Sequence, residues 1–120
     1  MLNINDFGGY GSQGEVDFQL IDELPEGLTR VPSEAGLLIL GHSETGHHHV
    51  VKESSNVELY SANDNKGTLF LVTKNNEVEL EHMRDNHTHK SWLFPANKVV
   101  RFNTTREASD NELGWVRALD

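Results

Sequence analysis

The sequence predicts an all-β protein: a single-domain small β-sandwich or barrel, with few or no helices. Apolar and polar residues alternate at period two along several segments, turn-forming residues recur at short intervals, and no amphipathic helical pattern is found. A chain of 120 residues has the length of one domain with one core. We therefore expect residues 1–120 to form a single β domain.

The first fourteen residues are expected to form a glycine-rich N-terminal arm, because residues 7–14 contain four glycines. Beyond this arm the apolar pattern predicts strands at 16–20, 36–42, 47–52, 56–61, 68–74, 77–82, 92–94 and 98–104, and either a strand or a turn of helix at 113–119. Asn75-Asn76 fits a two-residue hairpin loop, since asparagine tolerates the left-handed conformation that both central residues need.

Two clusters of histidines on these predicted strands carry the chemistry of the sequence. In the run from residue 47 to residue 49, the first and third histidines share a strand face and can bind one ion, while the second points away. His82 ends a strand whose same-face neighbours, Val78 and Leu80, should be core, so it is expected at the rim of the interior. His87 and His89 share a face if their segment is extended.

Gly41, His47, His49 and Glu53 have the spacing of the first half of the cupin metal motif, so the first cluster resembles that motif in part. The resemblance implies a cupin-like barrel as one form of the expected fold. Tyr60 stands where the motif requires glycine, and the second cupin motif is missing from the later part of the chain.

A closer resemblance covers nearly the whole chain. The segments that carry it are Asp22–Gly27, the Thr-Gly-His-x-His box at Thr45–His49, Val57–Tyr60, and the pair Arg106-Glu107. In these segments the chain resembles small bacterial and phage proteins of no established function. The resemblance implies that His82 and His89 are the second pair of ligands, although the spacer before His89 is longer here.

Together these patterns predict a site for one divalent metal ion, with zinc the expected ion and iron, nickel or manganese as alternatives. The predicted ligands are His47, His49, His82 and His89, with His87, Glu53 and Glu44 as further candidates. No catalytic residue and no binding site for an organic cofactor is predicted.

Composition limits the function classes. The formal net charge of −9 disfavours nucleic acid as a partner, and the absence of cysteine excludes disulfides and thiolate metal sites. No apolar run is long enough to span a membrane, and no secretory signal is recognised, so cytoplasmic synthesis is expected.

The first functional hypothesis is a non-catalytic, metal-stabilised β domain that serves as a structural component of a larger assembly. A phage virion is the expected assembly, with the chain as a capsid decoration or accessory protein that contacts other subunits as a homo-oligomer or within a lattice. The alternative is a cupin-like metalloenzyme in which three histidines and Glu53 or Glu44 leave one coordination position open. A third hypothesis is a small acidic inhibitor or adaptor of a host protein.

Overall fold

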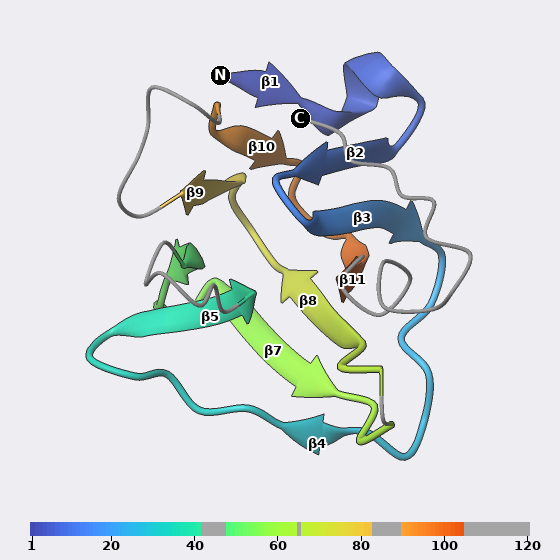
Figure 1. The fold of residues 1–120 in the computed structure, drawn as a ribbon, viewed down its shortest axis with the longest axis vertical. Coiled ribbons are helices and arrows are strands. Elements are labelled where there is room, and N and C mark those ends of the chain that lie inside the picture. The colour runs from blue at the N-terminus through green and yellow to red at the C-terminus, as the bar shows by residue number, and fades with distance from the viewer. Residues whose placement is uncertain (42–47, 65, 83–89, 105–120) are drawn as a thin grey trace.

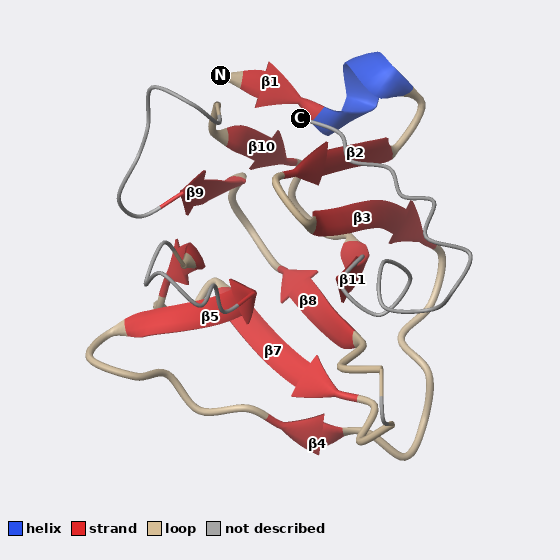
Figure 2. Cartoon of the chain, in the orientation of Figure 1, coloured by secondary structure: helices blue, strands red, loops and turns tan. Residues whose placement is uncertain are grey.

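The computed structural model describes residues 1–41, 48–64, 66–82 and 90–104, and in these ranges the regular structure is strand apart from one short 3-10 helix (Figures 1 and 2). The prediction of an all-β fold is confirmed. No helix in the described part is long and apolar enough to cross a membrane. The elements are β1 (Leu2–Asn3), η1 (Ile4–Phe7), β2 (Tyr10–Gln13), β3 (Val16–Ile21), β4 (Thr29–Arg30), β5 (Leu37–Gly41), β6 (His49–Lys52), β7 (Val57–Ser61), β8 (Leu69–Thr73), β9 (Val78–His82), β10 (Trp92–Phe94) and β11 (Val99–Thr104).

The strands form two sheets that pack together as a β-sandwich. The first sheet has the order β1-β10-β9-β6-β5, and the second has the order β2-β3-β11-β8-β7-β4. Neighbouring strands are antiparallel, except that β1 runs parallel to β10. Aromatic rings from both sheets meet in the core, where the Phe18 ring lies 5.1 Å from that of Trp92, 5.3 Å from Phe94 and 5.4 Å from Phe102.

Period-two alternation places the inward side chains as predicted, and β9 is the clearest example. Val78 and Leu80 are buried on the same face as His82, whereas Glu79 between them is exposed. A strand alternates its side chains between the two faces of a sheet, so this pattern fixes which face of β9 is inward. His82 therefore lies inside the sandwich, 5% exposed.

Residues 1–14, which the glycine content predicts as an arm, are built into the sandwich as β1, η1 and β2. Ile4 is completely buried, and the amide of Leu2 donates to the carbonyl of Ser91. Gly14 (φ +61°) and Glu15 form a two-residue hairpin loop between β2 and β3, with the positive φ at the first loop position only. That position takes glycine in type II′ turns.

The prediction of a hairpin at Asn75-Asn76 is wrong, because β8 and β9 belong to different sheets. Neither asparagine has a positive φ. Instead, the side-chain oxygen of Asn56 accepts hydrogen bonds from both of their backbone amides, at 2.7 and 2.9 Å. The link therefore turns the chain from one layer to the other, where a hairpin would keep it in the same sheet.

Glu58 on β7 makes the stability of the folded protein depend on pH. Lys74 Nζ donates to Glu58 Oε2 at 2.6 Å and Tyr60 Oη donates to Glu58 Oε1 at 2.7 Å, and these bonds lower the pKa of Glu58 below its ordinary value of 4.5. A lowered pKa in the folded state stabilises the protein above the ordinary pKa, and this stabilisation is lost as the pH falls through the lowered value.

We expect Glu58→Gln to lower the free energy of unfolding near neutral pH and to have a smaller effect at a pH below the lowered pKa. The loss should be modest, because the Lys74 side chain is 42% exposed. Urea unfolding at the two pH values measures it, and Lys74→Met, which removes the partner, should reduce the same pH dependence. An equal effect of Glu58→Gln at both pH values would contradict the prediction.

Candidate metal centre

Two of the predicted ligands meet inside the sandwich. His49 opens β6 and is paired in register with His82, the last residue of the antiparallel neighbour β9. Residues directly opposite in antiparallel strands have neighbouring side chains, and the two ring centroids lie 4.7 Å apart. His49 has no exposed surface and His82 is 5% exposed. The structure thus brings together one histidine from each predicted cluster.

Gln13, at the end of β2 in the other sheet, holds the His49 ring. Its side-chain oxygen Oε1 lies 2.8 Å from His49 Nδ1. Its amide nitrogen Nε2 donates to the backbone carbonyl of Lys90 at 2.8 Å and makes a longer contact of 3.5 Å with the carbonyl of Leu80. Because Gln13 is 1% exposed, these bonds form inside the layer between the sheets.

The partners of Gln13 determine which nitrogen of His49 carries the proton. Backbone carbonyls can only accept hydrogen bonds, so the donating NH₂ group of Gln13 must face Lys90 and Leu80. The Gln13 oxygen then faces His49 Nδ1, which must be the donor. In the neutral ring the lone pair is therefore on Nε2. A metal-ligating histidine in proteins is held in the same way, by an acceptor on its other ring nitrogen.

The carboxylate of Glu15 lies at this Nε2 atom. Glu15 is the second residue of the hairpin loop between β2 and β3, and its Oε2 is 3.3 Å from His49 Nε2. The contact with His49 is the main cause that lowers the pKa of Glu15, and the charges of His49 and His82 act in the same direction. The Glu15 side chain is 38% exposed, so it lies between the buried ring and solvent.

A glycine on the neighbouring strand leaves room for the His49 ring. Gly41 on β5 is opposite His49, and a Cβ atom at this position would lie 3.2 Å from His49 Cδ2 and 2.6 Å from Val16 Cγ2. The second distance is shorter than carbon atoms tolerate. A side chain at position 41 would therefore displace the packing around the ring.

The other predicted ligands fall into two groups. Glu53 follows the far end of β6 and its Oε1 accepts a hydrogen bond from the Ser33 hydroxyl, so the structure does not bring it to His49, about 13 Å away along an extended chain. The others lie outside the described residues, and their assignment stays a prediction: His47, His87, His89 and Glu44.

Within the described ranges, no three histidine, aspartate or glutamate side chains are gathered as a metal site. Gln13 and Glu15 were not expected from the sequence, although they are the groups that contact the His49 ring. The Gly14-Glu15 pair is a recognisable hairpin signal and could have predicted β2. No sequence signal places β2 over His49, because that contact joins two different sheets.

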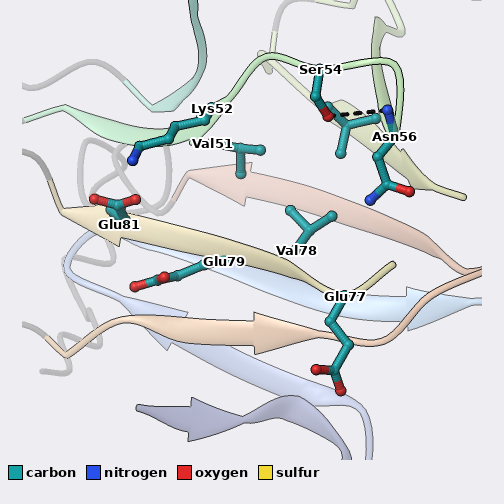
Figure 3. A pocket seen from close by; sticks show the side chains of 9 residues that line it. Val51, Lys52, Ser54, Asn56, Glu77, Val78, Glu79 and Glu81 are labelled. Carbon is teal, nitrogen blue, oxygen red and sulfur yellow. Dashed lines mark hydrogen bonds between the residues drawn. The ribbon is translucent and has the colours of Figure 1, made fainter. Parts of the chain in front are cut away.

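A hollow of about 220 Å³ lies elsewhere, lined by residues of β6 and β9 of the first sheet, by the residue before β9, and by the start of β7 with the turn that precedes it (Figure 3). Glu77, Glu79 and Glu81 surround it together with Lys52, and neither His49 nor His82 lines it. Its volume is below the usual range for small-molecule sites, about 300–1,000 Å³. The acidic outer face of β9 is thus separate from the histidine pair.

The fold and this site define a small β-sandwich protein with a buried pair of neighbouring histidine rings, one of which, His49, is hydrogen-bonded to Gln13 of the other sheet. The chain belongs to the family described as "Domain of unknown function (DUF8820)", whose model matches residues 12–96. That span includes Gln13, Glu15, His49 and His82. No curated protein and no solved structure matches the chain.

We expect Gln13→Leu to destabilise the protein, because it leaves the His49 Nδ1 proton and the Lys90 carbonyl without their buried partner. The expected loss is about 1–3 kcal/mol in the free energy of unfolding, measured by urea denaturation. Ser12→Ala, a change at a half-buried neighbour on the same strand, is the control and should cost less. Equal stability of Gln13→Leu and the wild type would mean that the carboxamide does not hold the ring.

Proposed function

We propose that this protein is a non-catalytic β domain stabilised by a divalent metal ion, and that it serves as a structural subunit of a larger assembly. The observation that carries the metal half is the buried imidazole of His49, whose Nδ1 is held by Gln13 and whose ring neighbours His82. This arrangement leaves Nε2 as the coordinating atom, and imidazole is a preferred ligand of zinc and related ions.

The burial of two imidazoles side by side supports a ligand role. Polar groups lose their hydration when they are buried, and this costs free energy unless partners compensate. An apolar pair at positions 49 and 82 would avoid that cost, and the other buried polar side chains of the described residues are Gln13, Thr68 and Thr73. A bound metal ion would reverse the balance, since its binding free energy adds to the stability of the folded chain.

A metalloenzyme of the cupin type receives less support. That hypothesis assigned a ligand role to Glu53 or Glu44, and Glu53 is hydrogen-bonded to Ser33 beyond the other end of β6. The hollow shown in Figure 3 is lined by neither histidine and is small for a substrate. The described residues therefore support a structural metal site better than a catalytic one.

We expect untagged protein to contain one zinc or similar divalent ion per chain by elemental analysis, and removal by a chelator to lower the melting temperature. Metal at 100 times its Kd contributes about 2.7 kcal/mol of stability. His49→Gln and His82→Gln should each abolish the effect of the chelator, whereas His48→Gln should retain it. A melting temperature that is unaffected by metal and chelator in the wild type would refute the metal half of the proposal.

The assembly half of the proposal rests on two exposed aromatic side chains near the N-terminus. Phe7, the last residue of η1, is 51% exposed, and Tyr10, the first residue of the edge strand β2, is 60% exposed. Both side chains line a shallow hollow that also includes Trp92, whose ring is 5.3 Å from that of Phe7. Exposed aromatic side chains next to a strand edge are typical of surfaces that contact other subunits. The resemblance to phage proteins makes a virion the first assembly to test.

We expect the purified protein to self-associate in sedimentation velocity, and Tyr10→Lys to weaken that association without loss of the folded state. Ser55→Lys adds the same charge at an exposed turn and should not change the association. Circular dichroism checks the fold of both variants. The assembly half would be contradicted if the wild type stays monomeric over the accessible concentration range and does not sediment with virions.

A further inference from the structure

We infer that the Glu15 carboxylate is a metal ligand and forms, with Nε2 of His49, one edge of a four-coordinate divalent-cation site beside His82. This inference rests on the proposed metal function and names a ligand that the histidine pattern does not contain. The bonding of the His49 ring, the distance from His49 to Glu15, the donor types and the exposure of the two side chains support it.

The two ring nitrogens of His49 have different partners. Gln13 Oε1 accepts a hydrogen bond from the Nδ1–H of His49, so a neutral His49 turns the lone pair of Nε2 towards the carboxylate oxygen of Glu15. Two atoms that both carry lone pairs repel each other at this distance. A cation must therefore be shared by them, and it is either a proton on Nε2 or a metal ion that both atoms coordinate.

His49 Nε2 and Glu15 Oε2 lie 3.3 Å apart. A charged N–H···O⁻ hydrogen bond is shorter, about 2.7–2.9 Å. Two ligands on a tetrahedral ion with bonds of 2.0–2.1 Å are separated by about 3.3–3.4 Å, whereas neighbouring ligands of an octahedral ion of that size are separated by about 2.8–3.0 Å. The separation of 3.3 Å matches a tetrahedral edge, and it also lies within the range of an ion pair between a protonated His49 and Glu15.

The identity of the donors limits the choice of ion. The larger calcium ion also gives ligand separations of this size, but it binds oxygen atoms and does not select imidazole. One imidazole nitrogen and one carboxylate oxygen, with the His82 ring centroid 4.7 Å from that of His49, suit zinc, cobalt or iron.

The two side chains differ in their access to solvent. His49 has no exposed surface, whereas the Glu15 side chain is 38% exposed and belongs to a hairpin loop at the surface. A carboxylate in this position can bind a hydrated ion from solvent and deliver it to the buried ring. The negative charge of Glu15 also offsets part of the charge of a divalent ion that two neutral imidazoles would leave uncompensated.

The experiment measures Zn²⁺ and Co²⁺ binding to metal-free protein by calorimetry, together with the visible absorption of the Co²⁺ complex. Glu15→Gln keeps the size of the side chain and should lower the affinity by more than about tenfold. Glu79→Gln removes the same charge from the exposed face of the strand that carries His82, and should leave the affinity within about twofold. The wild-type Co²⁺ complex should give the intense spectrum of four-coordinate cobalt, and Glu15→Gln should change it.

The outcomes separate this inference from the proposed function. Tight wild-type binding that Glu15→Gln leaves unchanged, in affinity and in the cobalt spectrum, would overturn the role of Glu15 and leave the histidine site standing. The weak spectrum of six-coordinate cobalt in the wild type would overturn the tetrahedral edge. No binding to the folded wild type would refute both. If Glu15→Gln destabilises metal-free and metal-loaded protein equally and leaves the affinity unchanged, the contact is a simple ion pair.

Discussion

The buried carboxamide of Gln13 is the interaction on which the candidate site depends. It belongs to β2 of one sheet and bonds to His49 and to the Lys90 carbonyl, which lie in or beside the strands of the other sheet. The carbonyl fixes the orientation of the amide, the amide fixes the tautomer of the imidazole, and the tautomer directs Nε2 towards Glu15. The packing of the two sheets thus determines which nitrogen of His49 carries the lone pair.

Most strands were predictable from the sequence, but β1, β2 and β4 were not, and neither was the distribution of the strands between the two sheets. Period-two alternation identified the inward face of β9, because half-buried strands place apolar side chains on one side only. The Asn75-Asn76 link looked like a hairpin loop, since local turn chemistry carries no information about the layer that the next strand joins. The decisive group is the side chain of Asn56, which accepts hydrogen bonds from both amides and lies 19 residues before the first asparagine.

The same limit explains which part of the site the sequence predicted. His82 was identified because it ends an alternating apolar pattern, and His49 was identified because it shares a predicted strand face with His47. Gln13 and Glu15 escaped notice because their contacts with His49 span 36 and 34 residues and depend on how two sheets pack. The type II′ signal at Gly14 would have identified the hairpin that carries both side chains. It would not have placed that hairpin over a histidine.

The position of the histidine pair suggests why a metal ion would matter to this fold. The first sheet joins β5 and β6 to β9, β10 and β1 through a short register between β6 and β9, which pairs His49 with His82 and Val50 with Glu81. A metal ion bound by both imidazoles would link these strands by two coordinate bonds at their narrowest junction. It would also close the loop of chain between residues 49 and 82, and such clips reduce the entropy of the unfolded chain. If Glu15 adds its carboxylate, the link extends to the hairpin of the second sheet, and one ion would then hold both layers of the sandwich together.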